Sequence, residues 1–161
     1  MKRRMGQRGF TYLGVLIAVA VVGVALAALG QLWSLQAQRE RERELLFVGE
    51  QYRVAFARYV AATPPGKARY PRTLEELAED RRHIVVRRHL RQVYPDPFTN
   101  ATDWETVTAP DGGIAAVHSR HDGKPIKIGN FPPQFAKFEE AASYRDWVFG
   151  APPPHAVSLP R

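Results

Sequence analysis

The chain has 161 residues, with 23 lysines and arginines against 16 aspartates and glutamates, and a formal net charge of +7. It contains no cysteine, which excludes disulfide bonds, thiolate catalysis and cysteine-based zinc sites. Four cations precede the first apolar run, where no acid occurs, leaving 19 cations against the 16 acids, or +3, in the rest of the chain. Much of the positive charge is therefore a membrane-topology signal, and nucleic acid is not expected as a partner.

A long apolar segment follows this basic leader. No charged residue occurs from Gly9 to Gln38, and a helix needs roughly 20 apolar residues to cross a bilayer. The segment is longer than the roughly 7–15 apolar residues of a cleaved secretory signal peptide. The four cations between residues 2 and 8 predict that the N-terminus stays in the cytoplasm. We therefore predict a single-pass membrane protein whose remaining residues lie across the membrane.

One helix is expected to run from Phe10 to Ala62, because nothing interrupts helical periodicity before the prolines at 64 and 65. Residues 39–44 alternate in sign, as is typical of a solvated helix. An apolar stripe follows, with spacings of three or four residues, and predicts the face that receives a globular domain. Its members are Leu45, Val48, Tyr52, Phe56 and Tyr59.

Short elements are expected beyond this helix. Thr73 and Glu76 have the spacing of a capping box and predict a short helix to about Asp80. Residues 84–90 fit either a strand or a helix. Two apolar runs on either side of Asp111-Gly112-Gly113 predict a β-hairpin from Trp104 to Ser119, and Lys124 to Ile128 are a candidate third strand.

The C-terminal part is rich in aromatic residues between Phe131 and Phe149. We expect this segment to pack onto the sheet, and contact with a partner is the alternative. Residues 151–161 include three consecutive prolines and are expected to form an extended tail.

The junction of leader and apolar segment carries a resemblance to a known family. Arg8-Gly9 followed by Phe10-Thr11-Tyr12-Leu13 resembles the processing signal of type IV pilins and type II secretion pseudopilins. Later patches occur in the order of the G-type major pseudopilin. These patches are Tyr70-Pro71-Arg72-Thr73-Leu74-Glu75-Glu76-Leu77, then Asp96-Pro97-Phe98, Trp104, Gly112-Gly113 and Ser119 to Gly123.

This resemblance implies an α+β fold, the pilin-like lollipop, in which a long N-terminal helix packs on a small antiparallel sheet domain. It divides the chain into five parts. These are a leader peptide (1–9), a transmembrane and filament-core helix (10–38), an amphipathic continuation (39–62), a periplasmic globular domain (63–150) and a flexible proline-rich tail (151–161).

The resemblance also implies a function. Prepilin peptidase would cut between Gly9 and Phe10, and the new N-terminus would be methylated. Assembly would then use the start of the mature helix, namely Phe10, Thr11, Tyr12, Leu13 and Gly14. The expected partners are other pseudopilins or pilins, the peptidase and an assembly platform in the bacterial inner membrane, with the C-terminal domain in the periplasm. The alternatives are a minor type IV pilin acting in adhesion or DNA uptake, and an uncleaved signal-anchor protein.

Two positions depart from the family pattern. The family usually has glutamate five residues into the mature chain, where this chain has Gly14. Either the subunit is added first, at a filament tip, or it is a diverged subunit held by packing alone. The family's calcium loop corresponds to Ser119–Gly123, where only Ser119 and Asp122 offer hard oxygen ligands. Because calcium takes six to eight oxygens, we expect no metal site there.

Catalysis is not expected, because the sequence contains no nucleophile elbow, phosphate-binding loop or dinucleotide fingerprint. We therefore predict a structural protein without a cofactor. A basic cluster in the globular part is expected to be a solvated surface that forms ion pairs with nearby acids, and DNA binding is the alternative. Its members are Arg81, Arg82, Arg87, Arg88 and Arg91.

Overall fold

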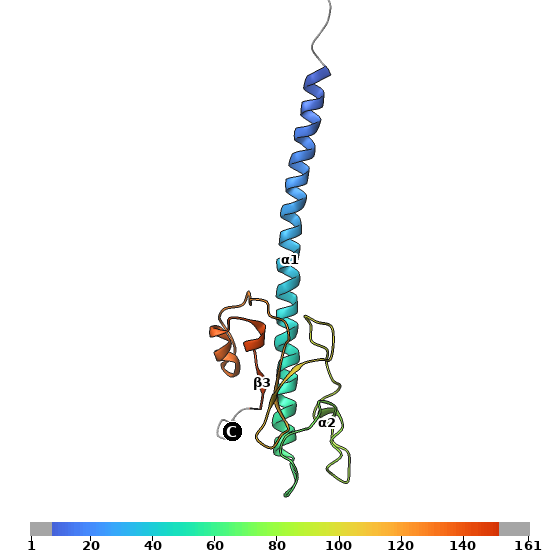
Figure 1. The fold of residues 1–161 in the computed structure, drawn as a ribbon, viewed down its shortest axis with the longest axis vertical. Coiled ribbons are helices and arrows are strands. Elements are labelled where there is room, and N and C mark those ends of the chain that lie inside the picture. Colours follow the sequence, from blue (N-terminus) through green and yellow to red (C-terminus); the bar gives the residue numbers. More distant parts are fainter. Residues whose placement is uncertain (1–7, 152–161) are drawn as a thin grey trace, which may run out of the picture. The chain divides into compact units, whose positions relative to one another are not determined.

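The computed structural model describes residues 8–151, apart from the side chains of residues 8–11, 28 and 32. The chain divides into two compact units, an N-terminal unit, Met1–Gln38, and a C-terminal unit, Arg39–Arg161. Helix α1, Arg8–Ala61, runs through both, and the other described elements belong to the C-terminal unit (Figure 1). The fold is α+β, as predicted. Most of the predicted leader (residues 1–7) and of the predicted tail (residues 152–161) lies outside the described residues.

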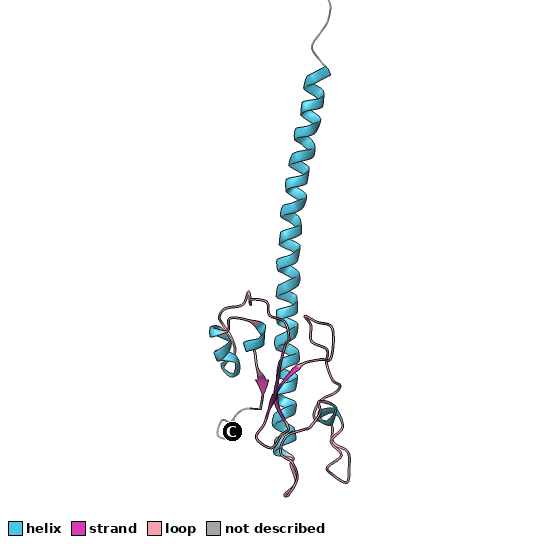
Figure 2. Cartoon of the chain, in the orientation of Figure 1, coloured by secondary structure: helices cyan, strands magenta, loops and turns pink. Residues whose placement is uncertain are grey.

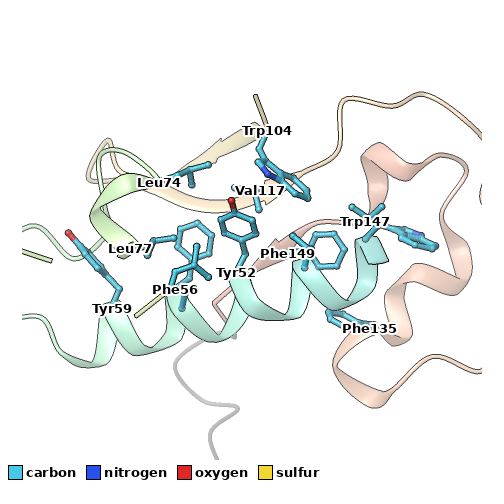
Figure 3. Close-up of a cluster of buried hydrophobic side chains, with 14 of the residues drawn as sticks. Tyr52, Phe56, Tyr59, Leu74, Leu77, Trp104, Val117, Phe135, Trp147 and Phe149 are labelled. Atoms are coloured by element: carbon cyan, nitrogen blue, oxygen red, sulfur yellow. The ribbon is translucent and has the colours of Figure 1, made fainter. Parts of the chain in front are cut away.

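Helix α1 ends at Ala61, one residue before the predicted end. The hydroxyl of Thr63 donates to the carbonyl of Tyr59 at 3.0 Å and holds the last turn, and the prolines prevent continuation. All five members of the predicted stripe are buried, and Ala55 joins them, so the predicted domain-facing side of the helix is confirmed. Figure 3 shows Tyr52, Phe56 and Tyr59 projecting from this face into the core.

The sheet has three strands in the order β1-β2-β3, all antiparallel. Strand β1, Glu105–Thr108, pairs with β2, Ile114–His118, and this confirms the predicted hairpin. Strand β3, Phe149–Gly150, pairs with the other side of β2. Figure 2 shows that loops make up most of the C-terminal unit outside α1.

The predicted third strand at Lys124–Ile128 is wrong, because these residues are irregular. Their backbone is held by a side chain instead. The buried carboxylate of Glu42 accepts hydrogen bonds from the N–H groups of Ile126 (2.5 Å) and Lys127 (3.3 Å) and from the hydroxyl of Tyr144 (2.8 Å). A carboxylate on α1 thus supplies the acceptor that a neighbouring strand would have provided.

The predicted capping box at Thr73 is also wrong. Helix α2 spans only Glu75–Ala78, its N-cap is Leu74, and no side chain caps it. The carboxylate of Glu76 turns instead toward α1, where it accepts from the hydroxyl of Tyr59 at 2.8 Å and from the N–H of Arg72 at 3.0 Å. Residues 84–90 form neither a helix nor a named strand.

The aromatic C-terminal segment packs into the core, and the prediction of packing is confirmed. It contains two short 3-10 helices, η1 (Pro133–Glu140) and η2 (Tyr144–Asp146). Their rings stack or meet edge to face, with the Phe138 and Trp147 centroids 5.4 Å apart at an interplanar angle of 7°. Figure 3 shows Trp147 and Phe149 beside the helix stripe. The buried aromatic residues of the segment are Phe135, Phe138, Tyr144, Trp147 and Phe149.

Gly49 sets how closely β3 approaches α1. A Cβ atom built at this position would overlap the ring of Phe149, which is fully buried. Only glycine therefore leaves room for that ring against the helix.

We expect Gly49→Ala to destabilise the C-terminal unit by about 1–3 kcal/mol, because overpacking a full core forces side chains or backbone to move. At an unconstrained helix position the same change would stabilise by about 1 kcal/mol. Urea unfolding of the full chain in detergent, followed by the fluorescence of the buried Trp104 and Trp147, measures the effect. Combining Gly49→Ala with Phe149→Leu should cost less than the sum of the two single changes. A stabilising single Gly49→Ala would contradict this account.

Candidate functional site

The apolar part of α1 in the N-terminal unit is the first candidate site. Its large hydrophobic side chains from Tyr12 to Leu35 are exposed over the described positions. Among the residues that the structure describes, this is the one helix long and apolar enough to cross a membrane, judged by length and composition. Exposed apolar surface on this scale marks an interaction with lipid or with other protein. The exposed residues are Tyr12, Leu13, Val15, Leu16, Ile17, Val19, Val21, Val22, Val24, Leu26, Leu29, Trp33 and Leu35.

The predicted processing and assembly residues lie on the first turns of α1. Gly9 and Phe10 have helical backbone, and the side chains of Phe10 and Thr11 are outside the description. The side chains of Tyr12 and Leu13 are 69% and 55% exposed. One continuous helix therefore joins these positions, and cleavage and assembly stay predictions.

Gly14 is not explained by packing within the described chain. A Cβ atom at Gly14 would meet nothing within 4 Å, and the same holds for Gly23 and Gly30. Glycine is thus sterically dispensable at position 14 in the isolated chain, so a larger residue can be introduced there as a test.

A buried ion-pair network is the second candidate site, and it lies at the C-terminal end of α1. Arg82 donates from Nε to one oxygen of Asp80 and from Nη2 to the other, both at 2.9 Å. His89 lies 3.0 Å from the second oxygen. The guanidinium also donates to the carbonyl of Tyr59 (3.0 Å) and to the hydroxyl of Thr63 (2.9 Å), and it covers the Tyr59 ring at 3.5 Å. The network therefore joins the loop after α2 to the last turn of α1.

The electrostatics of this network favour an ionised Asp80. Burial alone would raise the pKa of this carboxyl, but hydrogen bonds from Arg82 and His89, together with the charge of Arg82, hold the pKa well below its usual range. Burial and the hydrogen bond to Glu76 raise the pKa of Tyr59, which remains a neutral donor. The arrangement holds charges in fixed pairs at the end of α1.

The five arginines of the basic cluster separate into two groups. Arg82 is internal to the network, and Arg81 pairs with Glu79 at 2.8 Å, so the expected ion pairs form for these two. Arg87, Arg88 and Arg91 are exposed. The sequence treats the five alike: Asp80 directly precedes Arg81 and not Arg82, so sequence proximity does not single out the internal one.

The region compared with a calcium loop is held by protein groups. Ser119 is buried and its hydroxyl donates to Asp96 at 2.6 Å. Asp122 is exposed and lies 3.8 Å from the guanidinium of Arg145, which also donates to both oxygens of Glu105 at 2.7 and 2.9 Å. Within residues 8–151, no group of three or more histidines, aspartates or glutamates is placed to hold a metal ion.

Comparison of the chain with protein families, with curated proteins and with solved structures gives no match. The architecture rests on the geometry above, which is compatible with a pilin-like fold: a long N-terminal helix and a small antiparallel sheet. The family of this chain is therefore proposed below from the sequence motif and the fold.

Acid is expected to weaken the Asp80 network. The pKa of Asp80 lies below its unfolded value of about 4, so its contribution to stability is complete above about pH 4 and is lost as the pH falls toward the folded-state value. The difference in free energy of unfolding between the natural chain and Asp80→Asn should therefore stay nearly constant from about pH 6 to about pH 4 and shrink from there to about pH 2. Urea titrations at a series of pH values measure it, with the exposed Asp122→Asn as the matched control. A difference that stays constant with pH would rule out this account.

Proposed function

We propose that this protein is a structural subunit, not an enzyme, of a type II secretion pseudopilus. It is processed by prepilin peptidase after Gly9, anchored in the bacterial inner membrane with the N-terminus in the cytoplasm, and assembled through the N-terminal part of α1. Its partners are other pseudopilins, the peptidase and an inner-membrane assembly platform.

The observation that carries the proposal is the place of the processing motif. Arg8-Gly9-Phe10-Thr11-Tyr12-Leu13 stands where the basic leader meets a helix whose described apolar side chains are exposed. A cut at Gly9 removes the leader and leaves the apolar helix on the protein. That helix can then be held by lipid before assembly and by neighbouring helices afterwards, because both cover apolar surface.

The self-contained core of the C-terminal unit supports the same role. The buried apolar residues of the described chain all belong to this unit, from Leu45 to Phe149. The apolar part of α1 contributes nothing to that core, so it is available for membrane insertion or assembly without unfolding the domain.

Gly14 bears on the position of the subunit in the filament. Cleavage creates an α-amine at Phe10, and an unpaired charge in or near lipid costs several kcal/mol. In the family, the glutamate of an incoming subunit is thought to form an ion pair with the amine of a subunit already assembled. A chain with Gly14 has no carboxylate to pair with the amine of the preceding subunit. Its own amine can still pair with the glutamate of the next subunit. This property suits a subunit that is added first.

Co-expression with prepilin peptidase is expected to shorten the chain by the nine residues of the predicted leader. Intact-mass measurement and N-terminal sequencing should find Phe10 as the first residue, carrying a methyl group. Gly9→Leu is the control and should leave the chain uncut, because a bulky residue replaces the glycine at the cut. Met1 still attached in the presence of active peptidase would contradict the proposal.

A carboxylate at position 14 is expected to change where the subunit sits. In the Gly14→Glu variant, the subunit should be found along the filament and not only at its end, because the new carboxylate can pair with a neighbour's amine. Immunogold labelling of isolated filaments measures the distribution. Gly14→Gln, of similar size and without charge, should keep the natural distribution. If Gly14→Glu only increases the amount of filament, the subunit is not added first.

A further inference from the structure

The loop Arg81–Arg88, here called the 81–88 loop, exposes three consecutive aliphatic side chains. Ile84, Val85 and Val86 are 106%, 74% and 50% exposed. Single exposed apolar residues are ordinary on protein surfaces, but three in sequence at a loop tip mark an interaction site. The green loop beyond α2 in Figure 1 lies near the last turns of α1.

The base of this loop is firmly held. Asp80 and Arg87 exchange two backbone hydrogen bonds, of 2.8 and 3.1 Å, and form an antiparallel bridge across the base. The Asp80–Arg82 ion pair is at the same base. The N–H groups of His89 and Leu90, which follow the loop, both donate to the carbonyl of Leu77. Folding therefore presents the tip in a restrained position, which reduces the entropy lost when the tip is buried by a partner.

Basic residues flank the tip on both sides in the sequence. The run Arg81-Arg82-His83 precedes the aliphatic residues and Arg87-Arg88-His89 follows them. No acid occurs between residues 81 and 91. Before the tip, Arg81 pairs with Glu79 and Arg82 with Asp80, whereas Arg87 and Arg88 after it are exposed. An apolar tip thus stands between arginines on both sides.

This pattern fits a bilayer better than a protein groove. Ile84 and Val85 lie at bends of the loop and are 106% and 74% exposed, so a partner must surround the tip to cover them. A fluid hydrocarbon layer covers all three. The exposed guanidinium groups of Arg87 and Arg88 beside the tip match the phosphates of the headgroup layer, with which arginine forms paired hydrogen bonds.

We propose that the 81–88 loop is a membrane-docking loop: it inserts Ile84, Val85 and Val86 into the surface of an anionic bilayer while Arg87 and Arg88 bind lipid phosphates. The proposal does not rest on the proposed function, because it requires neither cleavage at Gly9 nor filament assembly.

Fluorescence at the tip tests insertion directly. The full chain, held in phosphatidylcholine nanodiscs, is mixed with vesicles of equal parts phosphatidylcholine and phosphatidylglycerol, or of phosphatidylcholine alone. Because the chain has no cysteine, Val85→Cys carries a single polarity-sensitive dye. Ile128→Cys is the matched control, since Ile128 is 74% exposed like Val85 and lies outside the loop.

Anionic vesicles should raise the dye fluorescence at position 85, with quenching by spin-labelled acyl chains, and should leave position 128 unchanged. Sedimentation should show about tenfold weaker binding for the double variant Ile84→Asp/Val85→Asp and for Arg88→Glu. Arg58→Glu, at another exposed arginine, should bind as the natural chain does.

Four outcomes would overturn the proposal. Equal dye responses at positions 85 and 128, or vesicle binding without a response at 85, would mean adsorption without insertion. A response at 85 that grows with protein concentration in the absence of vesicles would assign the tip to contact between copies of the chain. Binding to duplex DNA at low salt with no binding to anionic vesicles would assign the arginines to nucleic acid.

Discussion

One face of α1, from Leu45 to Tyr59, is the surface on which the rest of the C-terminal unit packs. The hairpin, the loop after α2 and the aromatic C-terminal segment all place apolar side chains against it, and each would lose its partner if the face were disrupted. At roughly 25 cal/mol per Å² of buried apolar area, these rings supply the dominant favourable term for a small domain with short strands. Polar atoms at the edge of the face are also satisfied. The hydroxyl of Tyr52 and the indole N–H of Trp104 both donate to the carbonyl of Tyr94.

Acidic side chains, several of them buried, perform much of the work that longer strands perform in other folds. Three short strands leave many backbone N–H groups without a ladder partner, and an unpaired buried N–H group is costly. Glu42 and Asp96 are buried and accept from the N–H groups of loop residues, and Asp111 accepts from three. Asp80 does the same at the base of the 81–88 loop while it pairs with Arg82. The irregular chain around the sheet is thus held at defined points by acidic side chains.

Elements with a local pattern could be predicted, and contacts that depend on distant residues could not. The stripe on α1 follows from its helical period, and the hairpin from the Asp-Gly-Gly turn between two apolar runs. Glu42 lies in a run of alternating charges and looked solvated, yet it stands three residues before Leu45 and so belongs to the buried stripe. Strand β3 has two residues, too few for any period. The processing site was proposed from its motif alone, and its use depends on a peptidase that acts on the chain from outside.

The contact between Gly49 and Phe149 has a consequence for how the protein is made. The ring that closes the core belongs to a residue about one hundred positions later in the chain than the glycine that receives it. Until residue 149 has left the ribosome, the helix face beside Gly49 lacks the ring that covers it, and non-local closure of this kind is slow. During synthesis the nascent chain therefore exposes apolar side chains of this helix. This exposure favours early delivery to a membrane or a chaperone over folding in free solution.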